Sequence, residues 1–185
     1  MTRKILSVLE DSPIIAAIKD KDGVSASEIP SDVIFDLGAN VMSIKTVISE
    51  AHSVGKTVFV HIDLAEGIGK DKYGIEFLKS VGADGIISTK SSLLRYAREL
   101  SMLTVKRIFL LDSQGVESAI TEMKDGSADL VEIMPGIMPK MIARFSSYGV
   151  PIIAGGLIET KAEITAALSS GAVAISTGKK ALWDL

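Results

Sequence analysis

A repeat with a period of about 45 residues is the feature that most limits what this chain can fold into. The segments GADGIIS (82–88), SADLVEI (127–133) and GAVAIST (171–177) each place an alanine after a small residue and before an apolar run. Their alanines are 45 and 44 residues apart, and a second kind of junction, seen in GKTVFVHID, SMLTVKRIFLLD and YGVPIIAGG, falls about halfway between them. The repeating unit is therefore about 22 residues long, which suits a minimal strand followed by a short helix.

Eight short apolar runs rich in β-branched residues follow this spacing, and we expect each of them to be a strand. Their hydrophobicity is nearly continuous, which is typical of parallel strands that are buried on both faces. The expected strands are 13–18, 32–37, 57–62, 85–89, 105–111, 130–135, 151–156 and 172–177.

Helical periodicity fills most of the intervals between these strands, as in 41–55, 92–101 and 161–171. Eight strands that alternate with helices predict an α/β fold of the (β/α)8 class, a TIM barrel. The 185 residues are fewer than the roughly 250 that are typical of this fold, so we expect a compact barrel with minimal loops and a single domain over 1–185. The competing architecture is an open doubly wound sheet, which seldom uses eight units of such even length.

Composition excludes several classes of protein and site. The chain contains no cysteine, which excludes disulfide scaffolds, cysteine-bound zinc and thiol catalysis, and no spaced set of His, Asp and Glu predicts a metal site. No apolar run approaches the ~18 residues of a membrane span, and no export signal is visible, so we expect a cytoplasmic protein without a membrane partner. A net charge of −3 argues against nonspecific coating of nucleic acid but leaves room for a local basic face.

The loops after the seventh and eighth expected strands read AGGLIET and ISTGKKALW. In barrels of this class, a phosphate site is often built from these two loops and the start of a short helix. Glycines let backbone N–H groups approach an anion, and hydroxyl groups add further donors, so we predict a phosphate site here. Its expected residues are Gly155, Gly156, Ser176, Thr177 and Gly178. The alternative is that the two adjacent glycines shape a tight turn and that Thr177 caps a helix.

Polar side chains also gather at the carboxyl ends of the other expected strands, where barrel proteins place their functional groups. Carboxylates suit the hydroxyl groups of a polyol and lysines suit a phosphate, so we predict that these side chains bind or position a ligand. They are Lys19, Asp36, His61, Asp63, Ser88, Lys90 and Glu132. Asp36, and Asp112 after the fifth strand, could instead cap the helices that follow them.

Two pairs of these polar residues could have a structural role in place of a functional one. Glu132 is expected to face Arg107 on the neighbouring strand, and we favour a buried ion pair over a catalytic pair. His61 and Asp63 lie two residues apart on one face of a strand, so they could act in acid–base chemistry. A single histidine on a strand is more often a hydrogen-bonded structural or ligand-positioning group.

Six segments of the chain resemble, in order and spacing, the family of glycerol-3-phosphate-responsive antiterminators, the bacterial regulators of glycerol uptake operons. The resemblance covers residues 13–183, whereas residues 1–12 and 25–31 carry no informative motif. The segments are VHIDLAEGIGKDKYGIEFL, GIISTKSSLLRYA, KRIFLLDS, VEIMPGIMPKMI, PIIAGGLI and GAVAISTGKKALW. By position, the family's motifs fall on His61, Asp63 and Leu64, on 87–91, on 134–136 and on 154–156.

The resemblance implies a barrel that binds glycerol 3-phosphate as its effector, uses no cofactor, and acts on a leader mRNA to suppress a transcription terminator. It implies a ligand-sensing regulator and not an enzyme, so no residue is assigned a catalytic role. The RNA contacts do not transfer from any motif. The candidates are basic residues on two expected helices: Lys90, Arg95, Arg98, Lys140 and Arg144. Ordinary solvated helix faces explain these residues equally well.

Two other functions remain open on the residues alone. One is a metabolic enzyme, such as an isomerase, lyase or aldolase-like catalyst, that acts on a small phosphorylated substrate. His61, Asp63, Lys19 or Lys90 would then supply the acid, base or Schiff-base group. The other is a barrel that binds a phosphorylated metabolite and a protein partner. The sequence predicts neither the oligomeric state nor the face that meets the RNA.

Overall fold

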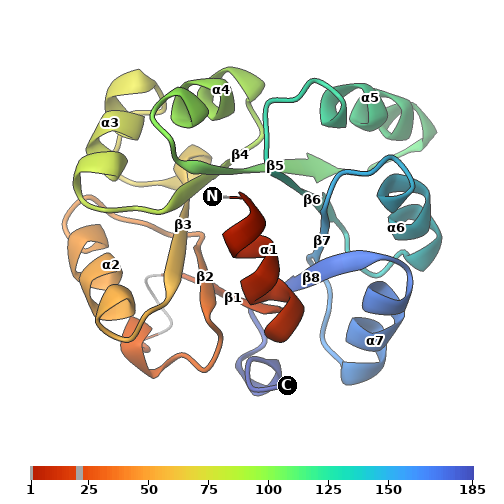
Figure 1. The fold of residues 1–185 in the computed structure, drawn as a ribbon, viewed down its shortest axis with the longest axis horizontal. Helices are drawn as coiled ribbons and strands as arrows, with labels where there is room; N and C mark the ends of the chain where they lie inside the picture. The colour runs from red at the N-terminus through yellow and green to blue at the C-terminus, as the bar shows by residue number, and fades with distance from the viewer. Residues whose placement is uncertain (1, 20–22) are drawn as a thin grey trace.

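The computed structural model describes residues 2–19 and 23–185, and these form a closed barrel of eight parallel strands (Figure 1). Each strand pairs with the next along the chain, and β8 pairs with β1, so the sheet has no free edge. The strands are β1 (Ile14–Ile18), β2 (Val33–Asp36), β3 (Thr57–His61), β4 (Gly85–Ser88), β5 (Leu103–Phe109), β6 (Leu130–Met134), β7 (Ile152–Gly155) and β8 (Ala172–Thr177). The predicted (β/α)8 barrel is confirmed, and the open doubly wound sheet is excluded.

Seven of the eight predicted strands agree with the observed strands to within about one residue at each end. The exception is β5, which was expected at 105–111 and begins and ends two residues earlier. Its first two residues pair with Gly85 and Ile86 of β4, which extends the strand at its start. The chain has left the sheet by Leu111, whose side chain is 87% exposed.

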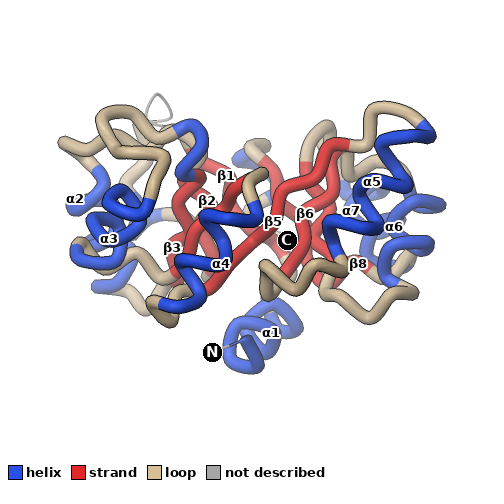
Figure 2. Tube along the Cα trace, turned by 90° about the horizontal axis from the view of Figure 1, so that it is seen from above, coloured by secondary structure: helices blue, strands red, loops and turns tan. Residues whose placement is uncertain are grey.

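Helices cover the outside of the barrel between successive strands (Figures 1 and 2). They are α2 (Ile44–Ser53), α3 (Lys72–Ser80), α4 (Ser91–Glu99), α5 (Ser113–Met123), α6 (Pro139–Ser146) and α7 (Lys161–Ser169), with single 3-10 turns η2 (Ala26–Glu28), η3 (Ile62–Leu64) and η4 (Lys180–Leu182). The predicted helices 41–55, 92–101 and 161–171 correspond to α2, α4 and α7, with ends that differ by up to three residues. Within the described part of the chain, no helix is long and apolar enough to cross a membrane.

The barrel interior is apolar at its amino end, where α1 (Thr2–Asp11) lies across the opening (Figures 1 and 2). Ile5 and Leu9 of α1 are buried in one cluster with inward-facing strand residues. That cluster includes Phe35 and Phe59, whose rings meet edge to face with centroids 5.4 Å apart. The helix therefore closes the barrel and completes its inner core, a role that no motif in residues 1–12 indicated.

Successive residues of a strand point to opposite faces, so each strand sends one set of side chains into the barrel and the other toward the helices. On β5, Leu103 and Val105 belong to the inner core, and Arg107 continues this inward series. Lys106 faces outward and is only 3% exposed. Its ammonium group donates to the Thr89 carbonyl at 2.8 Å and pairs with Glu122 at 2.9 Å. The buried lysine of β5 is therefore held in the helix layer and is not directed into the barrel.

Candidate functional site

A cavity of about 450 Å³ opens at the carboxyl end of the barrel, opposite α1. Its wall is formed mainly by the loops after β7 and β8, the loops for which the sequence predicts a phosphate site. The residues that line it are Ala17, Lys19, Leu37, Arg107, Met134, 156–159 and 176–179. Four of the five predicted phosphate-site residues therefore lie in one wall of the cavity, and Gly155 does not.

The two adjacent glycines after β7 have different structural reasons to be glycine. A Cβ atom on Gly155 would collide with the carboxylate of Glu132, which lies directly against this backbone. Gly156 has a φ of +74°, in the left-handed region where glycine carries no steric cost. Both glycines are therefore explained without a ligand: Gly155 by close packing against a buried carboxylate, and Gly156 by its left-handed turn. A phosphate that approaches the loop is not needed to explain them.

The hydroxyl group of Thr177 ties the two loops together. Its Oγ1 donates to the Ile158 carbonyl at 2.9 Å and accepts from the Lys179 N–H at 3.1 Å. The indole Nε1 of Trp183 donates to the Thr177 carbonyl at 2.8 Å. The helix expected after this segment is a single 3-10 turn, so Thr177 closes a turn and does not cap an α-helix. Its contribution to the cavity is the shape of the loop.

Arg107 and Glu132 form a buried ion pair inside the barrel, as the sequence analysis favoured. They are register partners on β5 and β6, and Arg107 Nε lies 2.6 Å from Glu132 Oε2. Their side chains are 5% and 0% exposed. Arg107 Nη2 and Glu132 Oε1 are buried and have no hydrogen-bond partner among the described residues. Leaving such groups unpaired is costly, so this pair retains one donor and one acceptor that a ligand could satisfy.

His61 is a buried, neutral imidazole at the end of β3. Its side chain is 5% exposed, and neither ring nitrogen has a hydrogen-bond partner among the described residues. Burial, assisted by the positive charge of Arg107, lowers the pKa of His61 to about 4. The Asp63 carboxylate, 4.0 Å from Nε2, opposes this shift but does not overcome it. At neutral pH the ring can therefore both donate and accept a hydrogen bond.

Asp63 fixes the loop after β3 against the end of β4. Its Oδ1 accepts from the Ser88 hydroxyl at 2.8 Å, and its Oδ2 accepts from the Thr89 N–H at 2.7 Å and hydroxyl at 2.9 Å. Burial alone would raise the pKa of Asp63, but the hydrogen bonds from Thr89 and Ser88 hold it below its ordinary value. The carboxylate is therefore committed to protein donors, which favours a structural role over acid–base chemistry with His61.

The remaining predicted polyol residues do not converge on the cavity. Asp36 is the outward residue of β2, and its Oδ1 accepts from the Gly38 N–H at 3.0 Å, so it does not cap α2. Ser88 is occupied by Asp63 and by the Lys90 N–H. Lys90 is exposed at the start of α4. The structure thus places Lys19 in the cavity wall, Glu132 and His61 in the barrel interior, and Asp36, Ser88 and Lys90 elsewhere.

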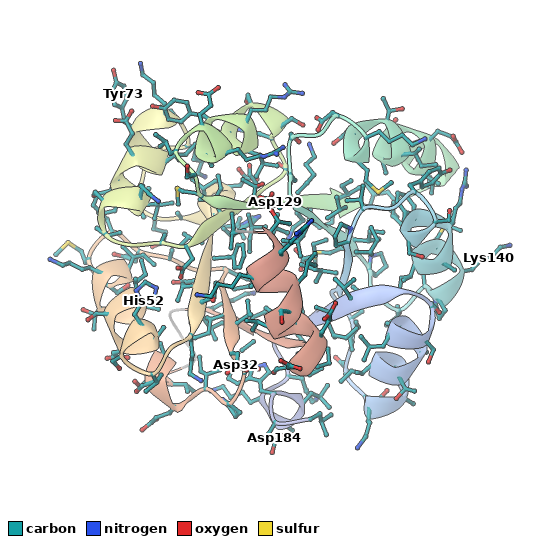
Figure 3. The ribbon with its side chains drawn as sticks, in the orientation of Figure 1. Asp32, His52, Tyr73, Asp129, Lys140 and Asp184 are labelled. Carbon is teal, nitrogen blue, oxygen red and sulfur yellow. The ribbon has the colours of Figure 1, made fainter. Side chains whose placement is uncertain are left out.

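The five basic residues predicted for RNA contact do not form one surface. Lys90 directly precedes α4, Arg95 and Arg98 lie on α4, and the other two lie on α6, which α5 separates from α4 (Figure 1). Three of them are engaged within the protein: Arg95 with Asp125 at 3.3 Å, Arg98 with the Gly126 carbonyl, and Arg144 with Glu117 at 2.6 Å. Lys140 extends outward from the edge of the ring of helices (Figure 3).

Two cationic residues of the cavity wall were absent from the predicted ligand site. Arg107 and Lys179 line the cavity together with Lys19, and Glu159 is the one carboxylate among its described lining residues. The expected pairing of Arg107 with Glu132 already placed both side chains inside the barrel, and that was the signal that could have identified Arg107. In the part of the chain that the structure describes, no group of three or more His, Asp or Glu residues could hold a metal ion.

Comparisons with known proteins point to one family. A family model described as "Glycerol-3-phosphate responsive antiterminator" matches residues 14–183. A protein of Escherichia coli K12, described as uncharacterized protein YgcP, is 35% identical over 184 residues, which cover 98% of this chain and 96% of that protein.

Two crystal structures agree with this family in both sequence and fold. The glycerol uptake operon antiterminator regulatory protein of Listeria monocytogenes is 33% identical with a TM-score of 0.85, over 92% of this chain and 94% of that one. A glycerol uptake operon antiterminator-related protein of Thermotoga maritima is 38% identical with a TM-score of 0.84, over 94% and 99%. More distant solved barrels, including aldolases 12–15% identical to this chain, share the fold alone.

Proposed function

Because the chain belongs to the family of glycerol-3-phosphate responsive antiterminators, we propose that it binds glycerol 3-phosphate at the carboxyl end of its barrel and then acts on a leader mRNA. Binding would favour a state of the protein that suppresses a transcription terminator ahead of genes for glycerol uptake and metabolism. An antiterminator has to meet nascent RNA, so the proposal places the protein in the cytoplasm. It requires no cofactor.

The charge of the cavity wall is the observation that supports this proposal most strongly. Lys19, Arg107 and Lys179 contribute three cationic side chains to the wall, whereas the carboxylates are Glu159 in the wall and Glu132, which pairs with Arg107 from behind it. The volume of about 450 Å³ lies in the range of small-molecule sites. A small dianion is therefore favoured over a neutral ligand, and we assign its phosphate to the wall formed by the loops after β7 and β8.

The glycerol part of the ligand is assigned to the Arg107 side of the cavity. Arg107 lines the cavity, whereas its partner Glu132 is 0% exposed and lies behind it. A hydroxyl group can accept from a guanidinium and donate to a carboxylate or an imidazole. Arg107 is thus proposed to contact the ligand directly, with Glu132 holding its guanidinium in place and His61 as a second, neutral polar group nearby.

A calorimetric titration tests the ligand. The protein is titrated with glycerol 3-phosphate, and with glycerol and inorganic phosphate as controls; the proposal expects saturable binding that is much tighter for glycerol 3-phosphate. Gly178→Val should abolish this binding, because Gly178 lines the cavity and its backbone accepts a side chain: a Cβ would lie 3.5 Å from the Ala17 carbonyl oxygen. Gly115→Val is the matched control, since Gly115 does not line the cavity. No binding of glycerol 3-phosphate, or equal binding of inorganic phosphate, would overturn the assignment.

A metabolic enzyme acting on a small phosphorylated substrate is the second candidate. The neutral, buried imidazole of His61 favours it, because an imidazole in that state can accept a proton from a substrate. His61→Ala separates the two functions. An enzyme would lose turnover of a triose phosphate while largely keeping its affinity, whereas a sensor shows no turnover in the unaltered protein either.

A further inference from the structure

Exposed apolar side chains are concentrated at one end of the molecule. Large hydrophobic side chains are exposed at the last residue of β5 and in the loops and first turns that follow β2, β3, β5, β6 and β7, all at the carboxyl end. They are Val41, Met42, Leu64, Tyr73, Phe109, Leu111, Ile137 and Leu157. The other described members of this class are Val54, Tyr148 and Leu185. Two of the side chains at the carboxyl end, Tyr73 and Phe109, are aromatic, and exposed aromatic rings can stack with unpaired bases.

Three exposed lysines lie on the part of this end that follows β3 and β4. Lys70 and Lys72 flank the start of α3, and Lys90 precedes α4. None of the three forms an ion pair with a described residue. Lys72 lies over the ring of Tyr73, with its ammonium 4.9 Å from the ring centroid. Unlike the arginines of α4 and α6, these cations remain available to an anionic partner.

The carboxylates nearest to these lysines are largely engaged with the protein's own backbone. Asp71 accepts from the N–H groups of Tyr73 and Gly74 at the start of α3, and Asp63 accepts from Thr89. Glu66 is exposed in the same loop. Hydrogen bonding leaves these carboxylates charged, so the arc attracts an anion through its three exposed ammonium groups, which form no ion pair with a described residue, on a protein whose net charge is −3.

We propose that the RNA binds to this arc, defined as Lys70, Lys72, Tyr73, Lys90 and Phe109, across the ends of β3, β4 and β5. Ammonium groups neutralise phosphates, and exposed aromatic rings stack with unpaired bases, so the pattern fits a single-stranded segment better than a duplex. Tyr73 is 67% exposed at the outer edge of α3 (Figure 3), and Phe109, the last residue of β5, is 50% exposed. The inference rests on the proposed antiterminator function and adds the surface that meets the RNA.

The position of the arc also gives a route for the effector to act on RNA binding. Phe109 lies two residues beyond Arg107 on β5. A ligand that repositions Arg107 would therefore act on the strand that carries one stacking ring of the arc. Differential affinity of the ligand for the two positions supplies the coupling.

The test measures RNA binding by variants with matched charge changes. The probe is a short single-stranded RNA pool of random sequence, enriched against the protein in the presence of glycerol 3-phosphate. The arc variant is K70E/K72E/K90E, and the control is K4E/K79E/K124E, which changes three exposed lysines at the amino-end side. The control is matched closely, because Lys79 lies on the same helix as Lys72 and Lys124 lies 4.3 Å over the Tyr148 ring as Lys72 does over Tyr73.

The arc variant should bind the pool at least about tenfold more weakly, with a slope of log affinity against log salt smaller by about 2, as expected for three lost phosphate contacts. The control should change affinity by no more than about threefold, and both should keep their affinity for glycerol 3-phosphate. If the triple variant does not fold, the single variants K70E and K90E replace it, and each should weaken binding of the pool. Tyr73→Ala should reduce ultraviolet crosslinking of the protein to the RNA. Equal losses in the arc and control variants would overturn the arc but leave RNA binding standing. No binding of the pool by the unaltered protein would overturn the proposed RNA function and the arc together.

Discussion

The two ends of the barrel interior are built from opposite chemistry. At the amino end, α1 closes the barrel over apolar side chains, including the Phe35 and Phe59 rings. At the carboxyl end, the interior holds Arg107, Glu132 and His61, each with a buried polar atom that no described residue satisfies. The first arrangement stabilises the fold by burying apolar surface, whereas the second costs stability and retains hydrogen-bonding capacity. Under the proposed function, stability and ligand recognition are divided between opposite ends of the same strands.

Removing an aromatic ring from the closed end should give the largest effect on stability. Phe35→Ala is expected to lower the free energy of unfolding by about 3–5 kcal/mol, because Phe35 is 0% exposed and packs against Phe59. Urea unfolding measures this loss, and calorimetry at a temperature where the variant stays folded measures its affinity for glycerol 3-phosphate. That affinity should change little. A variant that loses affinity in proportion to stability would contradict the separation of the two ends.

Converting the polar end toward the chemistry of the apolar end should separate stability from binding. Arg107→Met alone is expected to cost about 3 kcal/mol, because it leaves the Glu132 carboxylate buried and unpaired. The double variant R107M/E132L should recover most of this loss, since two apolar side chains replace a buried ion pair. Both variants should fail to bind glycerol 3-phosphate. Retained binding by the double variant would show that the pair has no part in recognition.

The buried imidazole makes the polar end sensitive to acid. The folded pKa of His61 is about 4, below its ordinary value of 6.5, so folding favours the neutral ring. The stability contributed by this group is present above pH 6.5 and is lost as the pH falls toward 4, because the unfolded chain binds the proton more tightly. Between pH 7 and pH 5 the loss should be about 2 kcal/mol.

His61→Gln keeps a polar side chain that does not titrate in this range. Urea unfolding at the two pH values should show a smaller loss for this variant than for the unaltered protein. Carboxylates such as Asp63, whose pKa is lowered in the fold, contribute stability that is lost at still lower pH. Identical losses in the two proteins would mean that other groups cause the acid sensitivity.

The smallest predicted effect concerns the start of α7, just beyond the cavity. Thr160 caps this helix: its hydroxyl accepts from the Glu163 N–H, and the Glu163 carboxylate accepts from the Thr160 N–H. Thr160→Ala should cost about 1 kcal/mol in thermal unfolding. Affinity for glycerol 3-phosphate should stay within about threefold, because neither residue lines the cavity. A much larger loss of affinity would extend the ligand site into the helix cap.

The fold was predictable because eight apolar runs at nearly even spacing are compatible with few architectures. The closure by α1 was not predictable in the same way. The packing of Ile5 and Leu9 depends on an opening that exists only once the strands have closed into a barrel. The sequence of residues 1–12 by itself therefore does not predict where this helix packs.

The location of the candidate site could be predicted from the sequence better than the residues that form it. Strand order and strand ends located the loops of the cavity, but strands buried on both faces give no sign of which face looks inward. Asp36 and Ser88 were therefore grouped with Lys19 and Glu132, although the structure turns them outward. Similarly, residue 155 is a glycine because Glu132 of the neighbouring strand packs directly against it, and these two residues are distant in the sequence.

Hydrogen exchange with and without glycerol 3-phosphate tests the division between the two ends most directly. We expect the ligand to slow amide exchange in 155–159, in 176–179 and at the carboxyl ends of β5 and β6, while exchange in α1 and at the amino ends of the strands stays unchanged. Protection that is concentrated in α1, or spread evenly over both ends, would contradict the assignment of recognition to the carboxyl end.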